Sequence, residues 1–312
     1  MILEPITYKG GLYRHEEIIE IIEDLGGYII QMQQIAGDII ILALVPKEDL
    51  GLIEAVAKPI NGSVKVSPLV GTEIAVVSMS LEIHHLPHAT CDVAEYLRQF
   101  GAKTNVIGLA RGFGKRIAQL NVEERDVINE HDAAVLLYGN FEECIRKKNP
   151  KISRGITVPI IATGAPDKEA LMKCIDPPVE GYVGGLGRLA HRAKRPEELA
   201  KLDEMVGEVS RVLDVKRVEI YKDPLSVAPP RLMDLIIEKV PAIHEVTSPT
   251  PITVQMAGLR VKLPYEVYAD SLRNLELEQG VKLGDIADVL PSRMRTYIWI
   301  RVRPFSETKV MV

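Results

Sequence analysis

Four apolar runs between residues 73 and 164 constrain the fold of this chain more than any other feature. Runs with so little polar alternation are typical of parallel strands that helices cover on both faces. Helical patterns follow them, and we therefore predict a doubly wound, Rossmann-like α/β domain over residues 71–190. In such domains ligands bind at the edge where the strands end. The strands are EIAVVSM, TNVIGLA, AAVLLYG and ITVPIIATG, and the helices are CDVAEYLRQF, FGKRIAQL, FEECIRKK and DKEALMKC.

The first seventy residues show a different order of elements. In HEEIIEIIEDL the isoleucines recur at helical spacing, and Gly26 and Gly27 follow as a stop signal. The order of short strand-like and helical segments is β-α-β-β-α-β, which predicts a ferredoxin-like α+β domain over residues 1–70. That fold name implies no iron. The segments are ITYKGG, HEEIIEIIEDLGG, YIIQM, DIIILALV, EDLGLIEAVAK and SVKVSPL.

Residues 191–312 are predicted to form a C-terminal α+β domain, so that the whole chain is a multidomain protein of mixed α/β and α+β class. PEELAKLDEMVGEVSRVLD has the spacing of an amphipathic helix. VKRVEIY follows as a separate segment, then a helix from near Pro230, AIHEVTS, the strands ITVQM and LRVKL, another helix and TYIWIRV. We expect this domain to be a distant echo of the first.

Composition excludes several classes of protein. The net charge of -5 argues against binding driven by nucleic-acid phosphates. No apolar stretch reaches the ~20 residues that cross a bilayer, and the start of the chain shows no secretory signal. Three cysteines cannot form a disulfide framework, which fits a reducing compartment. We therefore expect a cytoplasmic protein without nucleic-acid or membrane partners. Residues 71–195 carry 17 basic against 15 acidic residues, so this middle part is suited to an anionic ligand.

The segment HHLPHATCD, residues 84–92, is the first candidate for a metal site. Pro87 excludes a continuous helix, so the segment is expected to be a loop, with Cys91 opening the next helix where the dipole favours a thiolate. Cys91 and the histidines could share one metal ion, although no standard zinc motif accompanies them. The alternative is that the histidines bond loop carbonyls and Cys91 is a small buried side chain. The candidate ligands are His84, His85, His88 and Cys91.

The other two cysteines are further candidates. Cys144 lies in the first turn of FEECIRKK, after the third strand, so the topology predicts it at the same edge as Cys91. Its alternative role is core packing. Cys174 ends the helix DKEALMKC and is expected near the opposite edge. Three cysteines cannot fill a four-thiolate iron–sulfur site, so a cluster would need histidine, a partner's cysteine or an unusual cofactor.

A glycine-rich turn, GLARGFGKR at residues 108–116, follows a strand and opens a helix, where backbone amides can bind an anion. It misses the Walker A pattern, because Leu109 replaces the first glycine and Arg116 replaces the Ser or Thr that binds magnesium. Nucleotide binding is therefore weakly supported, and a tight turn is the alternative. The candidate cofactor-binding residues here are Arg111, Gly112 and Gly114.

A second glycine-rich stretch is GYVGGLGR, residues 181–188. Gly184, Gly185 and Gly187 allow close backbone approach to a cofactor, and Arg188 supplies a fixed charge. An interdomain hinge is the alternative. His131 and Asp132 precede a strand and are expected to form a turn, and no GxSxG elbow supports a hydrolase.

Four segments together resemble methanogenesis marker protein 7, a family of methanogenic archaea: ITYKGGLYRHEEIIEIIEDLGGYI, HHLPHATCD, GLARGFGKRIAQLN and GYVGGLGR. The resemblance covers the whole chain. It implies a subunit of the assembly that activates methyl-coenzyme M reductase. The implied partners are the reductase, its operon C protein, marker proteins 3 and 17, and an ATP-binding-cassette ATPase. That ATPase would handle the nucleotide, so no nucleotide is expected on this chain.

The resemblance also implies an iron–sulfur cluster like the nitrogenase cofactor precursor, the L-cluster. Its irons are bridged internally, so one cysteine and one histidine can suffice as ligands. The leading hypothesis is an electron-transfer subunit, without enzymatic activity of its own, whose cluster is held or bordered by Cys91, one of the loop histidines and Cys144. The task of the assembly would be to deliver a low-potential electron to the reductase's nickel cofactor. The rivals are a scaffold without a cofactor and a small-molecule or nucleotide-binding α/β enzyme that uses residues 108–116.

Overall fold

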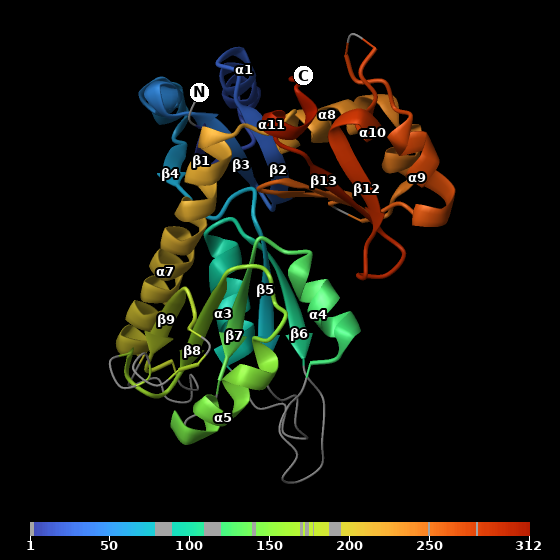
Figure 1. Ribbon diagram of the computed structural model, residues 1–312. Helices are drawn as coiled ribbons and strands as arrows, with labels where there is room; N and C mark the ends of the chain where they lie inside the picture. Colours follow the sequence, from blue (N-terminus) through green and yellow to red (C-terminus); the bar gives the residue numbers. More distant parts are fainter. Residues whose placement is uncertain are drawn as a thin grey trace. The chain divides into compact units, whose positions relative to one another are not determined.

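The structure is a computed structural model (Figure 1), and it describes residues 3–78, 89–108, 120–138, 142–168, 171, 175–176, 178–186, 195–248, 250–278 and 280–312. It divides into two compact units. One unit comprises Met1–Thr72, Phe100–Lys103 and Glu219–Val312, and the other comprises Glu73–Gln99 and Thr104–Val218. The expected mixed α/β architecture with several sheets is confirmed. The division into three domains stays a prediction, although each of the three sheets lies within one of the three expected ranges.

The first sheet is antiparallel, in the order β2-β3-β1-β4. Alternate residues of β3 are buried because one face of the sheet packs against helices. Ile41 shares this core with Ile18 and Ile22 of the first helix and Ile53 of the second. The expected element order is therefore present. The elements are β1 (Leu3–Gly11), α1 (Glu16–Asp24), β2 (Tyr28–Ile35), β3 (Asp38–Pro46), η1 (Lys47–Asp49), α2 (Leu50–Ala57), η2 (Lys58–Ile60) and β4 (Ser63–Val66).

The central sheet has five strands in the order β6-β5-β7-β8-β9, and β5, β7, β8 and β9 pair in parallel. Every residue of these four strands is buried, as their sequences predict. β9 was not predicted as a strand, because half of its four residues are glycine. The elements are β5 (Glu73–Ser78), α3 (Ala89–Gln99), β6 (Lys103–Gly108), α4 (Val122–Asn129), β7 (Ala133–Leu137), α5 (Glu142–Ile152), β8 (Ile160–Gly164), β9 (Gly181–Gly184) and α7 (Arg195–Lys222).

Helices cover the central sheet on two sides. Ile128 of α4 and Ile145 of α5 share one core with Val77 of β5. Among the described residues, none from α3 or α7 belongs to that core. Instead, Tyr96 of α3 donates a hydrogen bond of 2.6 Å to Asp203 of α7. We conclude that α4 and α5 cover one face of the sheet, and that α3 and α7 cover the other.

The long helix α7 corrects one prediction. VKRVEIY is not a separate segment but forms the last turns of this helix, which runs to Lys222. No glycine or proline interrupts the chain between Leu213 and Lys222, and Pro224 then disfavours helical backbone at the residue before it. In the described part of the chain, neither α7 nor any other helix is long and apolar enough to cross a membrane.

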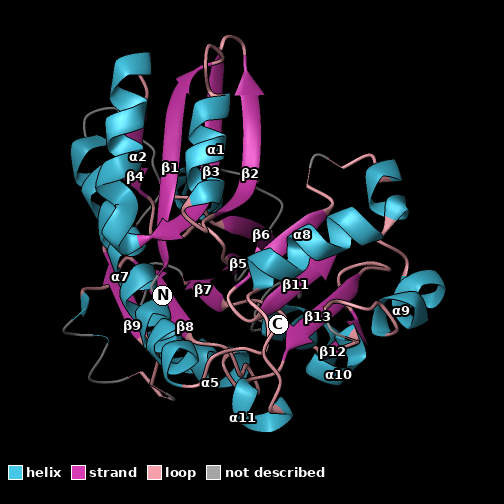
Figure 2. Ribbon diagram, turned by 90° about the horizontal axis from the view of Figure 1, so that it is seen from above, coloured by secondary structure: helices cyan, strands magenta, loops and turns pink. Residues whose placement is uncertain are grey.

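The C-terminal sheet is antiparallel, in the order β10-β11-β13-β12. Helix α8 packs against β10 and β11 (Figure 2), and Leu232 of α8 shares a core with Leu259 of β11 and Ile300 of β13. Helix α8 precedes the first hairpin of this sheet, and α9 and α10 lie between its two hairpins. The expected echo of the first domain stays a prediction. The elements are α8 (Pro229–Lys239), η4 (Pro241–Glu245), β10 (Ile252–Gln255), β11 (Gly258–Val261), α9 (Tyr265–Arg273), α10 (Leu283–Ile286), β12 (Ala287–Pro291), β13 (Ile298–Val302) and α11 (Phe305–Thr308).

Candidate functional site

The carboxyl edge of the central sheet is the candidate functional site. Its four parallel strands end there at Ser78, Leu137, Gly164 and Gly184. Segments that contain the candidate residues leave the sheet from strand ends. Most of these candidates lie outside the described residues, namely His84, His85, His88, Arg111, Gly112, Gly114, Cys174, Gly187 and Arg188. Of the candidate residues at this edge, the structure describes the side chain of Cys91 and the backbone of Gly184 and Gly185.

Cys91 lies in the first turn of α3, as the sequence predicts. Its thiol is free and the residue is exposed. This exposure differs from the alternative in which Cys91 is a small buried apolar side chain. Thr90, the residue before it, is buried and fixes the start of the helix against the protein. A free thiol at an exposed helix N-terminus can reach a ligand or a partner, and the helix dipole there favours an anion.

Asp92 follows Cys91, and its surroundings disfavour the charged form of its carboxyl group. Its Oδ2 atom is buried and has no hydrogen-bond partner among the described residues. Burial raises the pKa of the Asp92 carboxyl, and the nearby carboxylate of Glu198 raises it further. Glu198 lies in the first turn of α7, so the N-termini of α3 and α7 lie close together. A cationic or hydrogen-bond-donating group at this point would satisfy the buried oxygen.

The bond from Tyr96 to Asp203 holds the same two helices together about one turn further along. It raises the pKa of Tyr96 to about 12, first through the hydrogen bond itself and then through partial burial. Tyr96 therefore keeps its proton at neutral pH and remains the donor. The pairing keeps the first turn of α3 next to the start of α7, immediately after residues 187–194.

Cys144 is located in the first turn of α5, but its side chain lies outside the described part of the structure. α5 covers the face of the sheet opposite to α3, as the cores show. Cys91 and Cys144 thus belong to the same edge but to helices on opposite faces. The sequence predicts both residues at this edge but does not assign the two helices to faces of the sheet. Among the described residues, no group of three or more His, Cys, Asp or Glu side chains could hold a metal ion, so the metal site stays a prediction.

Gly184 allows a close approach of two backbone segments. A Cβ atom there would lie 2.6 Å from the carbonyl oxygen of Pro166 and 3.1 Å from the amide nitrogen of Lys168. The hydroxyl of Tyr182 also donates to the Pro166 oxygen, at 2.7 Å. Gly185 follows with φ of 75°, a conformation that favours glycine. The loop after β8 is therefore packed on the end of β9, a structural role that neither the cofactor hypothesis nor the hinge alternative included.

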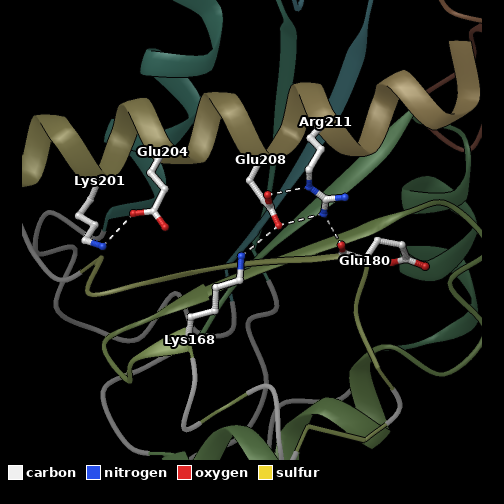
Figure 3. A network of polar contacts seen from close by, with 6 residues as sticks. All are labelled: Lys168, Glu180, Lys201, Glu204, Glu208 and Arg211. Carbon is white, nitrogen blue, oxygen red and sulfur yellow. Dashed lines mark hydrogen bonds and ion pairs between the residues drawn. The ribbon is translucent and has the colours of Figure 1, made fainter.

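A polar network joins α7 to this loop (Figure 3). Glu208 accepts hydrogen bonds from Arg211 Nε at 2.9 Å and Nη2 at 3.0 Å, and Lys168 lies 3.7 Å away. Arg211 also donates to the backbone oxygen of Glu180 at 2.7 Å, just before β9. Arg211 is the largest cause that lowers the pKa of Glu208. Sequence reasoning missed this network, whose only local signal is the Glu208–Arg211 spacing of three residues on a helix.

We expect the Glu208→Gln substitution to lower the free energy of unfolding by about 1–2 kcal/mol at neutral pH, because a charged hydrogen bond is lost. The folded-state pKa of Glu208 is depressed, so its stabilisation is present above the ordinary value of 4.5 and is lost as pH falls through the folded value. The difference between the two proteins should therefore shrink in urea unfolding at about pH 3.5. Glu204→Gln is the matched control, because its exposed pair with Lys201 should contribute at most about 0.5 kcal/mol. An undiminished difference at low pH would contradict the prediction.

A second polar cluster lies at the start of β5 and β7, the opposite edge of the sheet. Asp132 is buried and accepts a hydrogen bond from the backbone N–H of Glu73 at 2.9 Å. Lys216 of α7 lies 3.3 Å from its other oxygen. The sequence predicts a turn at Asp132, and the structure buries this residue as an anchor between two strands and a helix.

His131 belongs to the same cluster and is also buried. Its Nδ1 atom lies 2.8 Å from the carbonyl oxygen of Val127, so Nδ1 is the donor. Nε2 is then an acceptor for Asn105 Nδ2, at 3.0 Å. Asn105 Nδ2 also donates to the Glu73 carboxylate at 2.6 Å. These bonds are compatible with a neutral imidazole that has a structural role.

Comparison with known proteins shows to which family this chain belongs. The model of the methyl-coenzyme M reductase operon protein C family matches residues 3–275. The chain belongs to this family. The match includes the first two sheets completely and β10 and β11 of the third, and it contains Cys91, both glycine-rich stretches and α7.

A relative of this operon protein C family member is the uncharacterized protein MJ0094 of Methanocaldococcus jannaschii. It is 43% identical over 309 residues, which cover 99% of this chain and 96% of that protein. Among solved structures, a yeast Spc42 trimeric coiled-coil fusion has 13% identity and a TM-score of 0.30, covering 57% of this chain and 97% of its own. Glutamyl-tRNA reductase from Methanopyrus kandleri has 11% identity and a TM-score of 0.21, covering 78% of this chain and 85% of its own. Scores this low carry no argument about fold or function.

Membership in the operon protein C family suggests a role related to methyl-coenzyme M reductase. The sequence resemblance counted operon protein C among the partners, whereas the match assigns this chain itself to that family. Marker protein 7 is not confirmed as its identity and stays a prediction.

Proposed function

We propose that this operon protein C family member is a subunit of the ATP-dependent assembly that reductively activates methyl-coenzyme M reductase. The family match supports the link to the reductase, and the sequence resemblance supports the activating assembly. Its partners would be the reductase, marker proteins 3 and 17, and an ATP-binding-cassette ATPase. The chain would have no enzymatic activity alone, and the ATPase would bind the nucleotide. We also propose the ferredoxin-like fold for residues 1–70 and the Rossmann-like fold for residues 71–190.

The second part of the proposal is that the chain holds or borders an iron–sulfur cluster at the carboxyl edge of the central sheet. The observation that carries it is the free, exposed thiol of Cys91 at the N-terminus of α3. A four-thiolate cluster does not fit a chain with three cysteines. A cluster of the L-cluster type fits better, because it needs few protein ligands. When bound, it would supply a low-potential electron for the nickel cofactor.

The roles of the chain's own residues follow from this placement. Cys91 would be the thiolate ligand, with one of His84, His85 and His88 as the second ligand and Cys144 as a further one. The N-termini of α3 and α7 would offset the negative charge of the cluster. Hydrogen bonds to its sulfides would come from the two glycine-rich stretches with Arg111 and Arg188, which would tune the potential.

Metal analysis of protein purified without oxygen, together with its partners, tests the proposal. Iron and acid-labile sulfide should be present in the unaltered chain and should be lost in Cys91→Ser and in the triple variant of His84, His85 and His88 to Ala. Cys174→Ser is the control expected to keep both, because the sequence predicts this residue at the end of the helix DKEALMKC, near the opposite edge. Circular dichroism confirms that each variant is folded.

The other outcomes separate the rivals. Unchanged iron, sulfide and reductase activation in the Cys91 and histidine variants would contradict the cluster proposal and favour a scaffold without a cofactor. Zinc without iron would make the loop a structural metal site. A shift of the unfolding temperature with ATP, in the absence of partners, would favour the nucleotide-binding enzyme.

A further inference from the structure

Strand β2 is an edge strand without the usual protection. Among the described strands it pairs with β3 alone, at one end of the order β2-β3-β1-β4, as Figure 2 shows. Its sequence, YIIQMQQI, contains no charged residue and no proline. Natural edge strands usually carry lysine, proline or another feature that prevents pairing with a second chain. Because β2 lacks such features, its free edge is suited to pairing with a strand of another chain.

The open part of the edge is its second half. Ile30 packs against the C-terminal core, and α8 contacts the strand, so the first half is partly covered. Gln31 is half-buried and the strand is exposed from Met32 onward, with Met32 and Ile35 51% and 56% exposed. Five residues span about 16 Å, enough for an added strand to pair with them.

Exposed apolar side chains also lie at the hairpin end of this sheet, after β1. Leu12 donates a backbone hydrogen bond to the carbonyl oxygen of Gly37, which places the chain after β1 beside the β2–β3 turn. Leu12 and Tyr13 are both exposed, Tyr13 by 79%. Within β2 itself, Met32 lies on the side of α1 and Ile35 on the opposite side, so Ile35 can contact the apolar side chains of an added strand.

The adjacent helix determines which side chains such a strand would carry. α1 contacts β2, and its sequence EEIIEIIED contains five acidic residues and no basic one. Glu23 is near enough to α8 to affect Asp234, whose pKa is raised first by burial and then by Glu23, against the lowering effect of Arg231. Glu23 therefore lies near α8, at the end of α1, and Glu16, Glu17 and Glu20 precede it along this helix. A second copy of this chain paired on β2 would bring two such helices together, so the charge disfavours a symmetric dimer.

We propose that residues 31–35 of β2 are a docking site for an extended segment of a partner protein in which basic and apolar residues alternate. The segment adds to the sheet as a fifth strand. Main-chain hydrogen bonds to β2 supply affinity, as in other cases of strand addition, and alternate side chains supply specificity. Its basic residues face the layer of α1, as Met32 and Gln34 do, because these two pair with the core residues Ile41 and Ile39. Its apolar residues face the opposite side.

Titration of the full chain with a synthetic peptide of alternating valine and lysine tests this site. We expect micromolar binding, and at least about tenfold weaker binding of two control peptides. One control has every second amide methylated, which removes strand pairing but keeps the charge. The other replaces lysine by glutamate. The variant Glu20→Lys/Glu23→Lys should reverse the preference towards the glutamate peptide, and both positions are exposed, so the fold should be kept.

Three results would overturn the proposal. Equal binding of the methylated peptide would show that charge alone drives the contact. Failure of every peptide to bind at about 1 mM would show that the edge is not a docking site. A stable dimer in sedimentation, dissociated by Gln33→Lys, would show that a second copy of this chain occupies the edge instead.

Discussion

The Gly258→Ala substitution is expected to lower the free energy of unfolding by about 3 kcal/mol or more, the upper end of the cost of overpacking. Gly258 begins β11 and pairs with Arg301 of β13. A Cβ atom there would overlap the backbone carbonyl oxygen of Ile300, so the obstacle belongs to the neighbouring strand itself. The two strands would have to separate and lose ladder hydrogen bonds. Urea unfolding measures the loss, and Trp299 of β13, the single tryptophan of the chain, reports on the sheet by fluorescence.

Gly207→Ala is the matched control for this substitution. Gly207 lies inside α7, and a Cβ atom there would meet nothing within 4 Å. Alanine in a helix should stabilise the protein by about 0.5–1 kcal/mol. The same chemical change is thus expected to have opposite signs at the two sites. An unchanged unfolding midpoint for Gly258→Ala would mean that β11 and β13 are not as close as described.

Asp132→Ala is expected to cost about 3 kcal/mol, because removing one partner of a buried ion pair leaves the other uncompensated. The substitution also leaves the buried backbone N–H of Glu73 without this acceptor. Lys216 is partly exposed, so water recovers part of its solvation and keeps the cost at the lower end of the range. Denaturant unfolding followed by circular dichroism measures the effect.

Two further variants show whether the loss of stability comes from the buried Asp132–Lys216 pair or from the loss of any negative charge. Asp214→Ala removes an exposed partner of Arg217 on the same helix and should cost at most about 1 kcal/mol. Adding Lys216→Met to Asp132→Ala should recover part of the loss, because no unpaired ammonium remains. If Asp132→Ala costs no more than Asp214→Ala, the buried cluster does not stabilise the central sheet.

The elements of the fold were predictable where burial leaves a local pattern. β5, β7 and β8 are uninterrupted apolar runs, and Ile18 and Ile22 recur at helical spacing in α1. β9 was missed because its glycines carry no apolar pattern, although it pairs with β8 in parallel. VKRVEIY was misjudged because valine and isoleucine favour strands, whereas the uninterrupted backbone continues the helix.

The sequence predicted the edge of the sheet at which the candidate site lies, but not the side-chain interactions around it. Pro87 and the end of β5 together predict a helix start at Cys91, and the structure has that start. The contacts of Asp92 with Glu198 and of Tyr96 with Asp203 join residues more than a hundred positions apart, so no local spacing reveals them. The side of the sheet on which α3 and α5 lie depends on strand order, which reverses at β5. Local sequence patterns do not encode that order.

The two units are interleaved along the chain, and this has a consequence for how the protein is made. The short segment Phe100–Lys103 belongs to the first unit, where Phe100 and Lys103 bond to Leu69 and Thr72, although the second unit surrounds it in sequence. During synthesis on the ribosome, the central sheet is complete once α7 has emerged. The first unit must wait for the last strand, β13, to leave the ribosome. Until then, Ile30 of the first sheet lacks the C-terminal core against which it packs. A chain that ends before β13 therefore leaves the N-terminal part of the first unit, Met1–Thr72, without its C-terminal part. The central sheet can already have formed in such a chain.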